Sequence, residues 1–414
     1  MSGILSGLRV IEGSAFVAAP LGGMTLAQMG AEVIRFDPIG GGLDYGRWPL
    51  VQNKGAEAGA SLFWAGLNKG KKSICLDLAK PEGQEIATAL ITAPNGPRGE
   101  DAGLFLTNFP ARGWLDYAKL KARRADLIML AITGHHDGTT AVDYTVNCAT
   151  GFPFVTGPAT AEEPINHVLP AWDAICGVTA ASGLLAAERH RSKTGEGQLV
   201  TLALSDVAYA MAGHLGFIGE VELNQTERPR YGNYLYGGFG RDFVARDGRR
   251  VMIVALTLRQ WQSLLKSTGL AEAMAQVAAR HGLANLDDEG DRFRAREEIA
   301  VVLAPWIAAR DLAEISAALD ATGACWGPYQ SFAQMVAADP RCSTANPLFA
   351  RVDHPGVGNL LTPGSPLAFA SHARLAPQPA PRLGAHTDEI LSDLLGLSSG
   401  EIGRLHDAKL VAGA

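Results

Sequence analysis

The 414-residue chain lacks several features that mark particular classes of protein. Its five cysteines form no C-x-x-C pair, which argues against a zinc site or a disulfide framework and favours reduced cytosolic thiols. It has no uncharged apolar run of 18 residues, and its first residues are not a basic segment followed by a long apolar one. We therefore expect no membrane span and no signal peptide, and a cytoplasmic location.

An excess of positive charge is also missing. Lys and Arg number 36 against 42 Asp and Glu, and the formal net charge is −6. This argues against a nucleic-acid partner bound through a basic surface, but it allows a local basic pocket for a small acidic molecule. With 47% hydrophobic and 19% charged residues, the chain is expected to be globular and long enough for two or three domain-sized units.

The first half of the chain alternates between predicted strands and predicted helices. Continuous apolar runs predict buried strands at 8–12, 31–36, 72–78, 103–109, 126–132 and 197–206. Helical spacing predicts helices at 19–29, 81–91 and, in an Ala- and Gly-rich stretch, 173–191. Strand–helix–strand units of about 30 residues imply an α/β fold with a parallel sheet.

The composition changes after residue 207. The turn "ARDGRR" predicts a hairpin, and amphipathic segments follow it, so we expect a smaller α+β domain at 225–335 after a linker at 206–224. The Pro- and Gly-rich stretch from about 340 predicts a long surface connection. The expected caps of two last helices are Thr387 and either Ser398 or Ser399.

Motifs for common cofactors are weak. The turn after the first strand, "EGSAFVAAPLGG", lacks the G-x-G-x-x-G spacing of dinucleotide sites, although Asp37 ends the second strand, where a ribose-binding acid would lie. His135 and His136 are adjacent and point to different sides, so a turn is favoured over a metal site. We predict no metal site. Arg47 follows the glycines at 40–42 and could pair with a phosphate or carboxylate, or be an ordinary exposed arginine.

Asp173 is a lone acid in the apolar stretch "HVLPAWDAICG". The residues alone allow two interpretations: an N-cap of the following helix, or a nucleophile, since a partly desolvated carboxylate is competent for attack. The helix dipole would keep such a carboxylate ionised. His167, six residues upstream, could contact a substrate or simply pack.

Seven segments in order resemble the family III CoA-transferases. They are "LRVIE…AAPLGGMTLAQMGAEVIRFDPIGGG", "NKGKKSICLDLAKPEG", "LFLTNFPARG", "DLIMLAITG", "D…G…ASGLLAAERHRSKTGEGQLVTLALSD", "ARDGRRVMI" and "PAPRLGAHTDEIL". The resemblance covers nearly the whole chain, and the last segment is a specific family ending.

The resemblance implies a Rossmann-like large domain built from 1–205 and 340–414, a small α+β middle domain, and a homodimer whose two chains interlock. It places the catalytic aspartate at Asp173 and implies CoA as part of an acyl-CoA substrate, with no tightly bound cofactor. The family's CoA-contacting positions fall on the following residues: Phe16, Val17, Ala18, Asn108, Phe109 and Arg112.

Departures from the family pattern carry further expectations. Val17, Pro38 and Thr133 replace polar or basic residues, so phosphate contacts are expected from Arg35 and Lys71, or from Lys69 and Lys72. A set of substrate candidates is expected to hold a free carboxylate or an oxyanion: Arg47, His135, His167, Gly238 and Arg241.

The implied activity is intramolecular transfer of CoA between the two carboxyl groups of one C5 unsaturated dicarboxylic acid, through an aspartyl anhydride and an enzyme–CoA thioester. Three alternatives stay open: intermolecular CoA transfer to a second acid, 2-methylacyl-CoA racemisation, and non-catalytic CoA binding. Val142 stands where the racemase pattern has a histidine base, which counts against racemisation.

Overall fold

The computed structural model describes residues 3–52, 59–96 and 101–413. The chain divides into two compact units. Unit 1 comprises Met1–Thr150, Val168–Leu223 and Pro340–Ala414, and unit 2 comprises Gly151–His167 and Asn224–Asp339. Both units are therefore built from separate stretches of chain. The segment 151–167 belongs to unit 2, a contribution that the sequence did not indicate.

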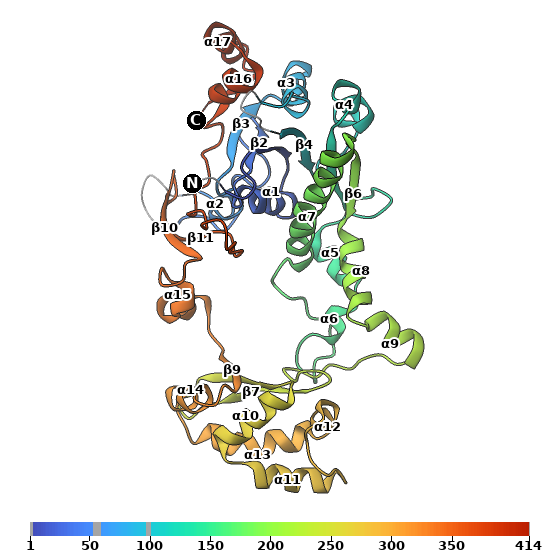
Figure 1. The fold of residues 1–414 in the computed structure, drawn as a ribbon, viewed down its shortest axis with the longest axis vertical. Coiled ribbons are helices and arrows are strands. Elements are labelled where there is room, and N and C mark those ends of the chain that lie inside the picture. Colours follow the sequence, from blue (N-terminus) through green and yellow to red (C-terminus); the bar gives the residue numbers. More distant parts are fainter. Residues whose placement is uncertain (1–2, 53–58, 97–100, 414) are drawn as a thin grey trace. The chain divides into compact units, whose positions relative to one another are not determined.

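Unit 1 is built on a seven-stranded sheet in the order β12-β3-β2-β1-β4-β5-β6 (Figure 1). Its strands are β1 Leu8–Gly13, β2 Glu32–Pro38, β3 Lys72–Leu76, β4 Asp101–Thr107, β5 Ile128–Thr133, β6 Leu199–Ala203 and β12 Val411–Ala412. All neighbours are parallel except β12, which pairs antiparallel with β3. The six parallel strands follow the doubly wound order, which reverses between β1 and β4. The predicted parallel α/β sheet is confirmed.

Helices cover both faces of this sheet. The helices of unit 1 are α1 Ala18–Ala27, α2 Leu62–Leu67, α3 Pro81–Ile91, α4 Tyr117–Arg123, α5 Asp143–Cys148, α7 Ala171–Thr194, α8 Leu204–His214, α9 Phe217–Asn224, α16 Thr387–Leu395 and α17 Ser399–Asp407, with 3-10 turns at Gly113–Leu115 and Pro340–Cys342. Residues from α3, α4, α16 and α17 share one core with the strands. The expected linker at 206–224 instead forms α8 and α9, because its apolar residues continue a helical repeat.

The return segment after residue 340 also differs from the expected plain connection. It contains an antiparallel hairpin of β10 Phe349–His354 and β11 Gly358–Pro363. Of the two predicted caps of α17, Ser398 is the one that caps it, accepting a hydrogen bond from the N–H of Glu401. The cap prediction for Thr387 is wrong. Its hydroxyl is buried and donates to the carbonyl of Ala412, tying α16 to β12.

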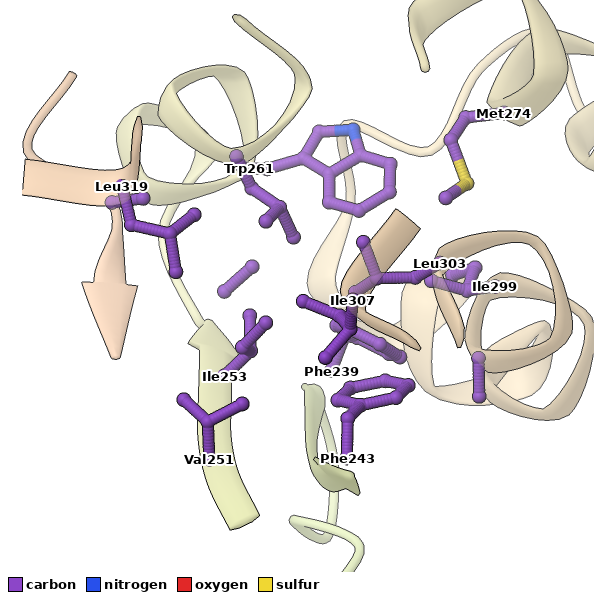
Figure 2. Packing of buried hydrophobic residues seen from close by; sticks show 14 of the residues in the cluster. Phe239, Phe243, Val251, Ile253, Trp261, Met274, Ile299, Leu303, Ile307 and Leu319 are labelled. Atoms are coloured by element: carbon purple, nitrogen blue, oxygen red, sulfur yellow. The ribbon is translucent and has the colours of Figure 1, made fainter. Parts of the chain in front are cut away.

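Unit 2 is an α+β body with its own core. Its three-stranded antiparallel sheet is formed by β7 Phe239–Val244, β8 Arg250–Ala255 and β9 Cys325–Pro328. Its helices are α6 Phe152–Val155, α10 Leu258–Thr268, α11 Ala271–Arg280, α12 Glu289–Arg294, α13 Arg296–Ala308, α14 Leu312–Asp320 and α15 Phe332–Ala338. The predicted hairpin turns at Gly248, which has a φ of 78°. Figure 2 shows Phe239, Phe243 and Trp261 packed among aliphatic side chains of α13 and α14.

Helix α7 approaches α1 closely because small residues face each other. Gly177 lies against α1, where an added Cβ would be 2.7 Å from the carbonyl oxygen of Ala18. Gly22 lies against α7, where an added Cβ would be 3.0 Å from the carbonyl oxygen of Gly177. Backbone therefore packs on backbone, and the start of α7 is held beside the start of α1 (Figure 1).

Replacing Gly177 by alanine tests this contact. The new methyl group would press on the Ala18 carbonyl, so the free energy of unfolding in denaturant should fall by about 1–3 kcal/mol. Gly183→Ala in the same helix is the matched control, since its Cβ would meet only the end of the Leu130 side chain at 3.2 Å. We expect that variant to change stability by less than about 1 kcal/mol. Equal effects of the two substitutions would contradict the close approach.

Candidate active site

The strand order of unit 1 reverses between β1 and β4, and we call the region outside the carboxyl ends of these two strands the crevice. In doubly wound sheets ligands bind at this point, because the loops after the two strands diverge. The loop after β1 leads into α1, with Val17 as its N-cap and Ala18 as its first residue. Phe16 holds a positive φ of 65°, which turns the chain sharply into the helix.

The loop after β4 is fastened to the loop after β1. The N–H of Ala15 donates to Oδ1 of Asn108 at 2.9 Å, and Nδ2 of Asn108 donates to the carbonyl of Ala15 at 2.8 Å. Phe109 packs edge-on against Phe36, and Arg112 is exposed just beyond. The structure thus gathers the six predicted CoA-contacting residues along one edge of the sheet. Their contact with CoA remains a prediction.

Asp173 lies in the first turn of α7, whose packing holds that turn beside α1. The helix begins at Ala171 with Pro170 as its N-cap, so Asp173 is the third helical residue. The N-cap interpretation of Asp173 is therefore wrong. The capping group is Asp143, at the start of α5: its Oδ2 accepts the backbone N–H groups of Trp172 and Asp173 at 2.8 and 3.0 Å. The indole N–H of Trp172 adds a hydrogen bond to Oδ1 of Asn147 at 3.1 Å.

The environment of Asp173 opposes its negative charge. The pKa of this carboxyl is raised to about 7, first by burial and then by the nearby charge of Asp143, while the charge of Arg47 lowers it. Asp143 is only 2% exposed, and its Oδ1 is buried with no hydrogen-bond partner in the part of the chain that the structure describes. The helix dipole is expected to keep Asp173 ionised, but Asp143 already accepts the first amides of the helix, so these amides do not stabilise the Asp173 carboxylate.

Arg47 is the cation on this side of the crevice. Its guanidinium lies 5.2 Å from the centre of the Phe16 ring and 5.3 Å from the centre of the Phe63 ring. The side chain is exposed, and it acts electrostatically on Asp173. Aromatic rings from the loop after β1 and from α2 thus hold a positive charge near the carboxylate without neutralising it by an ion pair.

The remaining substrate candidates fall in different places. His135 follows β5 in unit 1, where its carbonyl accepts the Thr133 hydroxyl. His167, Gly238 and Arg241 belong to unit 2. Gly238 is buried directly before β7, and Arg241 lies within that strand. Their part in catalysis remains a prediction.

Arg35 and Lys71 do not fit the expected role in binding CoA phosphates. Arg35 is 1% exposed and donates to Asp37 and Asp44, and Lys71 is 4% exposed and donates to Glu12 at 2.7 Å. The sheet register sets Glu12 opposite Arg35. Their charges are balanced inside the fold, so a phosphate would have to displace buried carboxylates.

Lys72 and Asp37 also have partners in the fold, and Lys69 is buried. Lys72 pairs with Glu32 and Glu389, and burial lowers the pKa of Lys69 to about 8. Asp37 is bonded to Arg35 and is not open to a ribose. Within residues 3–52, 59–96 and 101–413, no helix has the length and hydropathy to cross a bilayer, and no cluster of His, Cys, Asp and Glu could hold a metal ion.

Sequence reasoning missed Asp143. It lies 28 residues before the first residue of the helix that it caps, inside the stretch "VDYTVN", of which the sequence singled out Val142 alone. An aspartate at the start of a short helix normally caps its own helix. Only the folded chain shows that this one caps α7.

Comparison with known proteins identifies the class. The model of CoA-transferase family III matches residues 5–387, and the chain belongs to this family. A CAIB/BAIF family protein of Brucella suis has a similar structure, with a TM-score of 0.76 at 22% identity over 95% of this chain and all of that one. That likeness agrees with the mixed α/β fold.

Individual relatives are more specific. The chain is 62% identical to 2-methylfumaryl-CoA isomerase of Chloroflexus aurantiacus, over all of this chain and 99% of that protein. It is 29% identical to succinyl-CoA:mesaconate CoA-transferase of Haloarcula marismortui, over 96% of this chain and 98% of that protein.

The Asp143–Asp173 pair predicts an unusual titration. In ¹³C NMR of aspartate-labelled protein, Asp173 should titrate near pH 7, with its signal identified by its loss in Asp173→Ala. Asp143→Asn keeps an oxygen that can accept the two amides but removes the charge, so the pKa of Asp173 should fall. A wild-type value near 4, or no shift in Asp143→Asn, would contradict the pair.

The raised pKa of Asp173 also makes the stability of the fold depend on pH. Because folding raises the pKa of Asp173, its contribution to stability is full below the unfolded value, about 4, and is lost as the pH rises through about 7.

Proposed function

We propose that this chain transfers CoA between the two carboxyl groups of one C5 unsaturated dicarboxylic acid, converting 2-methylfumaryl-CoA to 3-methylfumaryl-CoA. The observation that carries the proposal is Asp173: a desolvated carboxyl group beside the crevice of unit 1, facing the charge of Arg47. The 62% identical relative named 2-methylfumaryl-CoA isomerase supplies the substrate.

In the first half of the reaction, a carboxylate oxygen of Asp173 attacks the thioester carbonyl. The C–S bond breaks, CoA leaves as a thiolate, and a mixed anhydride links Asp173 to the acyl group. The thiolate then attacks the aspartyl carbonyl. This step releases the dicarboxylate and leaves CoA on Asp173 as a thioester.

In the second half, the dicarboxylate turns and its other carboxylate attacks the aspartyl thioester. The thiolate leaves again, and a second anhydride forms. The thiolate finally attacks the acyl carbonyl at the new carbon, which regenerates the Asp173 carboxylate. No proton is gained or lost overall, so the reaction needs a nucleophile and oxyanion donors, and it needs no general base.

The weakly stabilised charge of Asp173 suits this scheme. A carboxylate whose pKa lies near 7 is a better nucleophile than one held near 4, and about half of it is ionised near neutral pH. Asp143 contributes by occupying the helix amides that would otherwise stabilise Asp173. The same desolvation keeps water away from the anhydride.

We assign the binding of CoA to the crevice edge of unit 1, through residues 16–18, 108–109 and Arg112. CoA enters and leaves as part of the substrate. Arg47 and His135, with His167, are our candidates for holding the free carboxylate. Backbone N–H groups at 237–240, which include Gly238, are our candidates for the oxyanion donors. The charge of Arg47 near Asp173 supports its assignment.

Intermolecular transfer to a second acid is the second candidate function. It is favoured by one observation, the 29% identity to a relative named succinyl-CoA:mesaconate CoA-transferase. Racemisation is disfavoured, because the residue before Asp143 is Val142, whose side chain cannot exchange a proton with the α-carbon.

A single incubation separates the two transfer reactions. Purified enzyme with 2-methylfumaryl-CoA and no added acid should form the regioisomeric thioester. Chromatography and mass spectrometry measure its formation over time. Asp173→Ala should reduce this turnover to background while binding CoA normally in calorimetry. A strict need for a second carboxylic acid would favour the intermolecular reaction. Near-normal turnover of Asp173→Ala would refute the nucleophile.

We also propose that the protein is a homodimer with interlocked chains. Support comes from α8 and α9, which expose large apolar side chains: Tyr209, Leu215, Ile218, Val221 and Leu223. Helix α9 buries none of its residues within the described chain. A free monomer would rarely leave such a stretch uncovered.

Sedimentation at micromolar and nanomolar concentrations tests the homodimer. We expect twice the chain mass of 43.6 kDa, with no dissociation on dilution, because interlocked chains separate only on unfolding. A monomer at all concentrations would refute the dimer, and a dimer that dissociates freely would refute the interlock.

A further inference from the structure

Unit 2 carries an open pocket of about 510 Å³ that is rich in arginine. It is lined by the 157–159 loop, the 230–234 loop, β7 with β8, and the start of α13. Its charged residues are four arginines and two carboxylates: Arg230, Arg241, Arg250, Arg296, Asp242 and Glu297. Every lining residue belongs to unit 2.

The two carboxylates neutralise little of this charge. Asp242 is buried and forms a salt bridge with Arg250. Glu297 is largely exposed, accepts the Tyr234 hydroxyl at 2.8 Å, and lies 3.9 Å from Nε of Arg296. One ion pair is thus close and one is loose, so the pocket keeps a positive excess.

Arg241 is held by an aromatic residue. Its Nη1 donates to the Tyr234 hydroxyl at 2.5 Å, and its guanidinium lies 4.7 Å from the centre of that ring. No carboxylate of the described chain is hydrogen-bonded to it. Strand alternation puts Arg241 on the same side of β7 as Phe239 and Phe243, whose rings lie in the core (Figure 2). The strand is therefore a rigid support for the guanidinium.

Arg230 and Arg296 are also fixed without close ion pairs. Arg230 donates to the carbonyls of Ala161, Pro153 and Glu163, and its Nε is buried without a hydrogen-bond partner in the described chain. Carbonyl acceptors position the side chain and leave its charge intact.

The start of α13 repeats this arrangement. Arg296 donates to the carbonyl of Phe293 at 2.9 Å and stacks near the rings of Tyr231 and Phe293. Its Nε is likewise buried with no hydrogen bond to any described residue. Arg230 and Arg296 thus both line the pocket with a positive charge that no close ion pair within the described chain neutralises.

We propose that this arginine pocket binds a small dicarboxylic acid through its carboxylate groups. Planar guanidinium groups match carboxylates with paired N–H donors. The pocket offers three such groups, so both ends of a short diacid can be bound, and the rings of Tyr231 and Tyr234 give a flat unsaturated acid a surface to lie on. The choice of diacid rests on the proposed function, whose mechanism releases a free C5 dicarboxylate.

Calorimetric titration of the whole protein with free 2-methylfumarate, without CoA, tests the pocket. We expect one saturable site whose Kd rises about tenfold or more in Arg241→Gln and in Arg296→Gln, the loss expected for a charge-assisted hydrogen bond. Arg246→Gln is the matched control. It removes one charge from unit 2 at an arginine outside the pocket lining, which pairs with Asp311 and Glu314, and it should leave Kd unchanged.

Three results would overturn the proposal. The first is that the wild type shows no saturable binding, and the second is that Kd is unchanged in both pocket variants. The third is that inorganic phosphate binds as tightly as the diacid and displaces it. Circular dichroism checks each variant for folding, and a misfolded one leaves the other to decide. The titration involves no turnover, so failure of isomer formation with intact diacid binding would count against the proposed function alone.

Discussion

The close contact between α1 and α7 decides where the reactive carboxylate lies. Helix α1 follows β1 directly, so its first residues lie at the crevice where the strand order reverses. Glycines in both helices let their backbones meet, which carries the first turn of α7 to the same place. Asp173 therefore belongs to the same packed body as the loop that we assign to CoA. A nucleophile on a mobile loop would have no such fixed relation to the thioester.

Packing brings Asp173 to the crevice, and Asp143 then sets its electrostatic state. A helix start normally stabilises an anion, but the amides of Trp172 and Asp173 point at Asp143. Partial burial and the like charge of Asp143 raise the pKa of Asp173, and the charge of Arg47 opposes these two effects. The fold loses some stability as the pH rises from about 4 through about 7, because this carboxylate is held where its charge is disfavoured, as is common where burial tunes a group for chemistry.

Features that depend on local chain chemistry were predictable, and those that depend on distant partners were not. Continuous apolar runs such as 31–36 predict buried parallel strands, because both faces of such strands are covered. The role of Arg35 could not be read in the same way. A charged residue in a strand is typical of a surface, and only the register with Glu12 and the return of Asp44 show that it is buried. Asp143 escaped prediction for the same reason, since its acceptor role involves amides 30 residues away.

The arginines of the two units differ in their partners, which are carboxylates in unit 1 and mainly carbonyl, hydroxyl or aromatic groups in the pocket of unit 2. Arg35 donates to two carboxylates at 2.9 Å in a fully buried site. These ion pairs neutralise its charge and hold β2 to the loop after it. Arg230 and Arg296 donate to carbonyls or stack on rings, and Arg241 donates to a hydroxyl, so each is held in place while its charge remains. A protein that only needed to fix these side chains could have used apolar residues of similar size, which avoid the cost of burying charge. Positive charge that is positioned but left without close counterions is the arrangement that recognises an anion.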